Sequence, residues 1–137
     1  MTPKIARFLE DVRPVTPCLV LDVDRVEQNY RALATALPLA RIYYAVKANP
    51  ARPVLERLVS LGSAFDAASW EEIEMTLAAG AAASAISYGN TVKKESAIAR
   101  AFAAGVRMYA FDSEEELEKL ARSAPGAKVY CRILVEN

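Results

Sequence analysis

Strand-like and helix-like runs alternate along most of this chain, and this alternation restricts the possible folds more than any other feature. The strand-like runs begin near Arg41, Ser63, Ala83, Arg107 and Lys128, roughly twenty to twenty-four residues apart. Each interval leaves room for one helix and two turns, which is the spacing of compact βα units. The sequence therefore predicts an α/β fold with a parallel sheet and about five βα units.

The helical runs between the strands carry recognisable start signals. Ser69 with Glu72 forms a capping box, and Ser113 begins a second one, in which the cap hydroxyl and the glutamate satisfy backbone N–H groups at the helix start. Pro53 suits the first turn of a helix, where its missing N–H is not needed. Thr91 is expected to cap the helix that follows it.

The N-terminal part has a different pattern. The run Pro17-Cys18-Leu19-Val20-Leu21-Asp22 predicts a short apolar strand. Asp24 with Glu27 is then expected to cap a helix that presents Val26 and Tyr30 on one face.

Two architectures suit five βα repeats. One is a complete open, doubly wound sheet of five parallel strands, for which 137 residues suffice. The other is part of a (β/α)8 TIM-type barrel, which typically takes about 250 residues. The last residues, 135–137, follow a predicted strand directly and no helix covers it, so a partial barrel is expected.

The composition excludes several classes of protein. Apolar residues make up 53% and charged residues 25%, and 17 basic residues balance 17 acidic ones, so neither a nucleic-acid partner nor a membrane span is expected. Cys18 and Cys131 form no disulfide or metal pattern, and histidine is absent. A cytoplasmic protein without a metal ion is the expectation.

The strongest candidate for chemistry is Lys47, which stands in the apolar run 41–50. If the end of this strand faces a site, burial would favour the neutral amine, which condenses with an aldehyde to form a Schiff base. The alternative is a lysine whose charged end extends into water. Alternation along the strand places Ala45 on the same face as Lys47, where its small side chain leaves room for a flat ligand.

Two further strands bring polar side chains to the same rim. Asp66 lies in the second strand, although it could instead cap a turn or form a salt bridge. Arg132 lies in the fifth strand, predicted over residues 128–134, and a mid-strand arginine among apolar residues needs a buried partner. The pattern predicts that Lys47, Asp66 and Arg132 form one polar cluster. Glu72 is explained by its capping box alone.

Five ordered motifs resemble those of the ornithine/diaminopimelate/arginine decarboxylase family, which uses pyridoxal 5′-phosphate (PLP) on an alanine-racemase-like barrel. The resemblance covers nearly the whole chain, and the bacterial ornithine decarboxylase branch, which includes enzymes that also accept lysine, is the most similar. The motifs are Tyr43–Asn49, Phe65–Ser69 with Glu72, Ile86–Lys93, Phe111–Ser113 with Glu116 and Leu117, and Cys131–Ile133.

The resemblance implies specific roles for the candidate residues. Lys47 would hold PLP as a Schiff base, and Asp66 would be the carboxylate beside it that biases the protonation of the lysine. Glu72 would be a second carboxylate near this pair. Arg132 would belong to the polar network of the cofactor, and Ala45 would lie against the cofactor ring. Lys47, Asp66 and Glu72 would thus be catalytic, and Lys47, Ala45, Asp66 and Arg132 would bind the cofactor.

The resemblance also implies the wider organisation. Residues 1–24 would contribute a strand to a β-domain that is mostly absent, and residues 25–137 would form the first part of the PLP-binding barrel. The remaining half of the enzyme would supply the phosphate-binding loop and the ring-stacking histidine. A homodimer with shared active sites would make putrescine from ornithine, and this chain alone is expected to be inactive. The alternatives are a decarboxylase of lysine and ornithine or of another basic amino acid, a non-catalytic PLP-binding or regulatory homologue, and an open-sheet binding domain without a cofactor.

Overall fold

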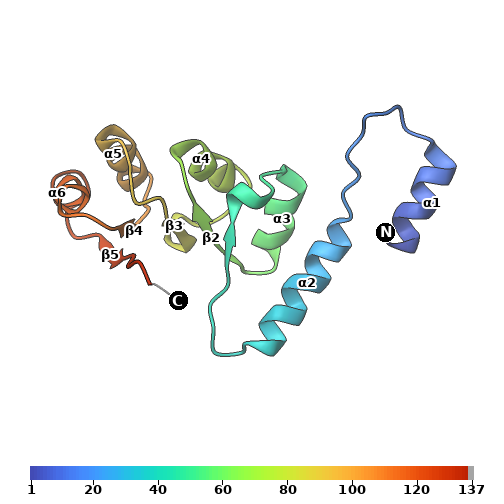
Figure 1. The fold of residues 1–137 in the computed structure, drawn as a ribbon, viewed down its shortest axis with the longest axis horizontal. Helices are drawn as coiled ribbons and strands as arrows, with labels where there is room; N and C mark the ends of the chain where they lie inside the picture. The colour runs from blue at the N-terminus through green and yellow to red at the C-terminus, as the bar shows by residue number, and fades with distance from the viewer. Residues whose placement is uncertain (136–137) are drawn as a thin grey trace.

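The computed structural model describes residues 1–135 and contains one parallel sheet flanked by helices (Figure 1). The strands are β1 Tyr43–Ala45, β2 Ala64–Ala67, β3 Ile86–Tyr88, β4 Met108–Phe111 and β5 Lys128–Cys131. The helices that follow the first four strands are α3 Arg52–Ser60, α4 Trp70–Ala78, α5 Glu95–Ala103 and α6 Glu114–Ser123. Two helices precede the sheet, α1 Pro3–Val12 and α2 Val23–Ala36, and two short 3-10 turns are η1 Val46–Ala48 and η2 Ala83–Ala85.

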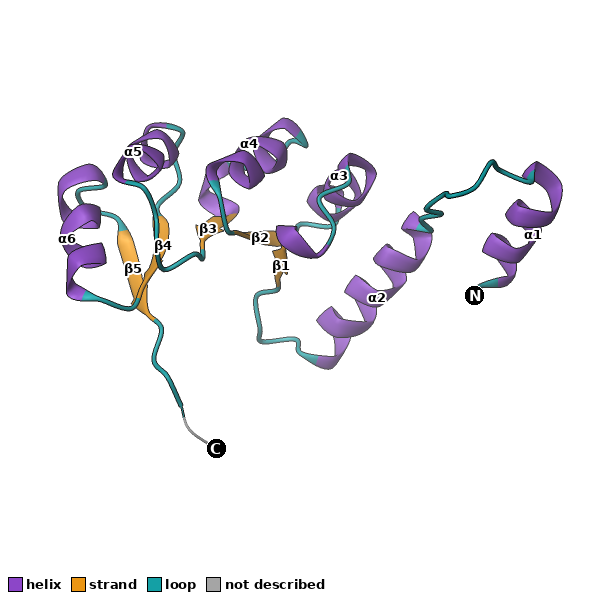
Figure 2. Cartoon of the chain, turned by 45° about the horizontal axis from the view of Figure 1, so that its top comes forward, coloured by secondary structure: helices purple, strands orange, loops and turns teal. Residues whose placement is uncertain are grey.

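The strand order decides between the two predicted architectures. The strands lie in the sheet in chain order, β1-β2-β3-β4-β5, and every pairing is parallel. Each crossover therefore advances in the same direction, and since βα crossovers are right-handed, all the helices fall on one face of the sheet. Figure 2 shows α3 to α6 along that one side. This is the arrangement of an arc of a TIM-type barrel, and a doubly wound sheet would carry helices on both faces.

The hydrophobic core fills the layer between the sheet and these helices. Phe65 and Ala67 of β2 are fully buried on the helix side, whereas Asp66 between them points to the other face. The helices contribute aliphatic side chains to the same layer, including Leu58, Ile73 and Leu120. The opposite, concave face of the sheet is consequently available to polar side chains.

Most predicted helix starts are confirmed. The hydroxyls of Ser69 and Ser113 accept hydrogen bonds from the N–H groups three residues on, and Pro53 lies in the first turn of α3. The prediction for Thr91 is wrong, because α5 begins at Glu95 after a longer loop, with Lys94 in the cap position.

The predicted strand over residues 17–22 is also wrong. These residues are extended but unpaired, and Leu19 is 89% exposed. A strand exists only through hydrogen bonds to a neighbour, and no strand within residues 1–135 lies beside this segment. The predicted cap at Asp24 is displaced as well, because Asp22 caps α2 by accepting from the Asp24 N–H. The proposed division at residues 24 and 25 stays a prediction.

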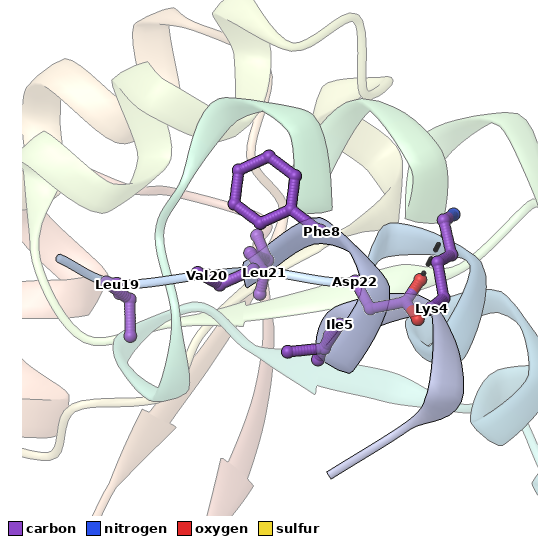
Figure 3. Close-up of a pocket in the computed structure, with 7 residues that line it drawn as sticks. All are labelled: Lys4, Ile5, Phe8, Leu19, Val20, Leu21 and Asp22. Atoms are coloured by element: carbon purple, nitrogen blue, oxygen red, sulfur yellow. Dashed lines mark hydrogen bonds and ion pairs between the residues drawn. The ribbon is translucent and has the colours of Figure 1, made fainter. Parts of the chain in front are cut away.

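Helix α1, which the sequence patterns did not indicate, packs against this extended segment instead. Figure 3 shows Ile5 and Phe8 of α1 around a pocket of about 260 Å³ whose other wall is residues 19–22. Lys4 pairs with Asp22 at its edge, 3.5 Å apart. The lining is aliphatic and aromatic apart from this pair, so we interpret the pocket as loose packing.

A buried ion pair anchors the loop between β3 and α5. The Lys93 ammonium donates to the carbonyls of Asn90 and Ala110 at 2.8 and 2.6 Å, and lies 2.8 Å from Oε1 of Glu116. The Lys93 and Glu116 side chains are 0% and 3% exposed. Lys119 pairs with the second carboxylate oxygen and donates to the Lys93 carbonyl. The loop is thereby held to β4 and α6.

We predict that Glu116→Gln destabilises the chain by about 3 to 5 kcal/mol, because the buried Lys93 ammonium would lose its counter-charge. The measurement is urea unfolding, and Glu114→Gln on the same helix start is the control, since Glu114 is exposed. Equal losses in both variants would contradict the prediction.

Candidate functional site

One residue from each strand forms a row across the concave face of the sheet. The register pairs Ala45 with Asp66, Asp66 with Ser87, Ser87 with Met108, and Met108 with Lys128. Paired residues of parallel strands project to the same side, so these five side chains share one face. They line a pocket of about 480 Å³ together with Tyr43, Val129 and Tyr130.

Asp66 is the carboxylate in the floor of this pocket. It is partly buried, and it lies directly against the backbone of Gly89, the first residue after β3. A Cβ at Gly89 would lie 2.6 Å from Cγ of Asp66, closer than real side chains approach. Glycine at this position therefore makes room for the carboxylate, and the Gly89 N–H donates to the Ala67 carbonyl at 2.9 Å.

The electrostatics of Asp66 reflect this position. Burial raises the pKa of Asp66 above its ordinary value, while hydrogen bonding from Ser87 and the positive charges of Lys47 and Arg132 pull the pKa down. Burial has the larger effect. Perturbed carboxylates in a concave site are typical of functional positions.

The sequence pattern predicted Lys47 at the end of a strand, but it lies beyond the strand. Strand β1 ends at Ala45, and Lys47 lies in the 3-10 turn η1, exposed to solvent. The turn is fixed by Asn49, whose side chain accepts from the Ala51 N–H at 3.0 Å and whose carbonyl accepts from the Tyr44 hydroxyl at 3.1 Å. Of the two alternatives that the sequence left open for Lys47, the structure shows the lysine whose side chain extends into water.

Arg132 is likewise placed differently from the prediction. Strand β5 ends at Cys131, and Arg132 follows it with its N–H donating to the Phe111 carbonyl at 2.8 Å. The residue is exposed, so the argument from a buried mid-strand arginine fails. No salt bridge within residues 1–135 joins Lys47, Asp66 and Arg132, although both cations act on the Asp66 carboxylate through their charge.

Glu72 acts on the turn that follows Asp66. Its carboxylate Oε2 accepts from the Ala68 N–H at 2.7 Å, and its own N–H donates to Ser69 Oγ at 3.2 Å. This is a capping arrangement displaced by one residue from the usual box, in which the glutamate would reach the cap residue itself. Glu72 does not line the pocket, and its catalytic role stays a prediction.

Three residues of the site and its supporting loop were not predicted from the sequence. Ser87 is a single hydroxyl inside the buried strand Ile86-Ser87-Tyr88, and this isolated polar residue was the available signal, whereas the register that sets it beside Asp66 comes from the structure. Gly89 was noted only as part of a motif, because its contact with Asp66 comes from another strand. Lys93 was likewise noted only as part of a motif, because its partner Glu116 lies 23 residues further along the chain.

The family model described as "Pyridoxal-dependent decarboxylase, pyridoxal binding domain" matches residues 23–137. The chain belongs to this family. The predicted family and its cofactor, pyridoxal phosphate, are thereby confirmed, and Lys47, Asp66 and Arg132 all fall inside the matched range.

Three relatives illustrate the range of similar proteins. A lysine/ornithine decarboxylase of Selenomonas ruminantium is 42% identical over 122 residues, which cover 89% of this chain and 31% of the relative. Antizyme inhibitor 2 of Xenopus laevis is 39% identical, covering 86% of this chain and 26% of the relative. The crystal structure of the Selenomonas ruminantium lysine decarboxylase with PLP and cadaverine superposes with a TM-score of 0.90.

The crystal structure confirms the expected partial barrel, at 39% identity over 100% of this chain and 36% of that one. The chain thus spans about a third or less of the length of its relatives. Among the helices within residues 1–135, none has both the length and the apolar character that crossing a membrane requires.

We predict that Asp66→Asn increases the free energy of unfolding at neutral pH. The folded-state pKa of Asp66 is raised, so its ionised form opposes folding, and the opposition grows as pH rises above the ordinary value of 3.8. Urea unfolding at pH 4 and pH 7 measures the effect, with exposed Asp112→Asn as the control. A loss of stability at pH 7 in Asp66→Asn alone would contradict it.

Proposed function

We propose that this chain is the lysine-bearing part of a PLP-dependent amino acid decarboxylase that acts on a small basic amino acid, ornithine in the first place and lysine as the alternative. The observation that carries the proposal is the pocket floor of a pyridoxal-binding domain, where the positive charges of both Lys47 and Arg132 act on the Asp66 carboxylate.

The pocket suits a flat aromatic cofactor. Its volume is about 480 Å³, Ala45 presents only a methyl group to it, and Gly89 presents no side chain at all where Asp66 lies. Lys47 would hold the aldehyde carbon from the turn after β1, and Arg132 would act from the end of β5. Bound PLP supplies an acceptor for the electron pair that decarboxylation releases.

The residues of the chain have separate tasks in this proposal. Asp66 holds negative charge beside the Lys47 amine and so biases where its proton resides. Glu72 keeps the turn after β2 in place through the Ala68 N–H. Ala45 leaves the floor flat enough for a ring to lie against it.

The proposed substrate class, small basic amino acids, is inferred from the names of the relatives. The name of the Selenomonas ruminantium relative includes both lysine and ornithine, and the neighbouring crystal structure contains cadaverine, the diamine that lysine yields on loss of its carboxylate. Ornithine would give putrescine by the same loss, which connects the protein to polyamine synthesis. The rest of the barrel, a homodimer with shared sites and a cytoplasmic location belong to the same proposal.

A second candidate function is a non-catalytic homologue. The match to antizyme inhibitor 2 favours it, because that relative is 39% identical and its name is that of an inhibitor. Amine production in a full-length protein that contains these residues would separate the two candidates.

We predict that pyridoxal phosphate attaches covalently to Lys47 and that Lys47→Ala abolishes the attachment. Borohydride reduction followed by peptide mass spectrometry locates the adduct, and the absorbance band of the Schiff base follows its formation. Lys94→Ala is the control, since Lys94 is an exposed lysine at the start of α5. An adduct spread equally over both lysines would refute the assignment of Lys47.

We also predict that the 137-residue chain alone releases little or no carbon dioxide from ornithine or lysine. The groups it holds can attach and orient the cofactor, but proton return to the product is expected to need residues from the rest of the enzyme. Chromatographic measurement of putrescine and cadaverine tests this. Robust amine production by this chain would contradict it.

A further inference from the structure

A pair of hydroxyl groups crosses the floor of the pocket beside Asp66. Ser87 Oγ on β3 lies 3.0 Å from the hydroxyl oxygen of Tyr130 on β5, so the tyrosine reaches over the intervening strand β4, where Met108 is located. Ser87 is 2% exposed, and its direct register partner on β2 is Asp66. The three polar side chains therefore lie side by side on the concave face.

The donor and acceptor capacities of these groups give the arrangement a direction. An ionised carboxylate only accepts hydrogen bonds, whereas a hydroxyl donates one and can accept another. Ser87 is the register partner of Asp66, so its hydroxyl is placed to donate to the ionised carboxylate while it accepts from the Tyr130 hydroxyl. Hydrogen bonding from Ser87 is the strongest of the influences that lower the pKa of Asp66 against burial.

We propose that Ser87 and Tyr130 are positioning residues, which hold the Asp66 carboxylate in one orientation on the pocket floor. Gly89 closes off one side of the carboxylate by direct contact, and the hydroxyl pair fixes it from β3 and β5. The remaining oxygen sites of the carboxylate are then free for a partner at the rim. That this partner is Lys47 rests on the proposed function.

Other charged and titratable groups lie near Asp66, and each of them can affect the pKa of its carboxyl group. Lys47 acts from the turn after β1 and Arg132 from the end of β5. Tyr43 and Lys128 line the same pocket from β1 and β5. Glu72 on α4 is turned toward the Ala68 N–H. Ser87, the register partner of Asp66 on the neighbouring strand β3, is the hydroxyl that lies beside the carboxylate on the sheet.

The purely structural interpretation is that Ser87 and Tyr130 satisfy each other and have no effect on Asp66. Ser87 Oγ is deeply buried, and a buried hydroxyl needs a partner for its own sake. The two interpretations differ in one measurable quantity. If the pair positions Asp66, its removal changes the titration of Asp66, and if it serves only packing, the titration stays the same.

The test is a carbon-detected NMR titration of the Asp66 carboxyl group in the 137-residue chain, assigned with Asp66→Asn. We expect Ser87→Ala to raise the pKa of Asp66 by about one to two pH units, the size of one hydrogen bond to a charged group. Tyr130→Phe is expected to raise it by less, and the double variant by no more than Ser87→Ala, because Tyr130 acts through Ser87.

Two controls accompany these variants. Tyr109→Phe removes a tyrosine hydroxyl from β4 that donates to the Val106 carbonyl on the helix side, so it should leave Asp66 unchanged. Ser87→Thr keeps the hydroxyl and should restore the titration of the parent chain. Circular dichroism establishes that each variant is folded, and if Ser87→Ala does not fold, Tyr130→Phe and Ser87→Thr carry the test.

An unchanged Asp66 titration in folded Ser87→Ala and Tyr130→Phe would overturn the inference. So would an equal change in Tyr109→Phe. The covalent attachment of pyridoxal phosphate at Lys47 is measured separately on the same samples. Loss of attachment at Lys47 in the parent chain would refute the proposed function without touching the hydroxyl pair, whereas a normal attachment with an unchanged titration would refute the hydroxyl pair alone.

Discussion

The structure depends on burying one face of a parallel sheet while the other face stays open. Alternation along each strand sends Phe65 and Ala67 into the helix layer and Asp66 to the opposite side. Since the strands follow one another in chain order, the helices all cover the same face. Asp66, Ser87 and Lys128 therefore share a single concave floor with Ala45 and Met108, and the whole candidate site follows from that geometry.

A second set of charges, formed by Lys93, Glu116 and Lys119, holds the loop that follows Gly89. Gly89 lies against Asp66, and the loop that continues from it is held by the buried ammonium of Lys93. Glu116 supplies the opposing charge from α6. Burial raises the pKa of Glu116, but hydrogen bonds from Lys119 and Lys93 outweigh burial, so its pKa lies below the ordinary value and the carboxylate remains ionised. The short loop from Gly89 to Lys93 thus connects the buried ion pair of Lys93 and Glu116 to the position of Asp66.

The places where the sequence interpretation failed share a cause. Lys47 and Arg132 were assigned to strands, yet each lies beyond a strand end, and the side chain of each is exposed. Residue alternation describes a strand only as long as its ladder continues, and the length of a ladder depends on the neighbouring strand. The segment 17–22 failed for the same reason, because its apolar pattern has no partner strand within residues 1–135.

The sequence by itself determined the α/β class, the position of most helices and the chemical character of the candidate residues, because caps, helix breakers and hydrophobic period are local properties. Its motifs also identified the family. Only the tertiary structure decided that the sheet is an arc with one covered face, that Gly89 makes room for Asp66, and that Ser87 and Tyr130 meet across β4. These are contacts between distant parts of the chain, and register and strand order, which no local pattern encodes, bring them together.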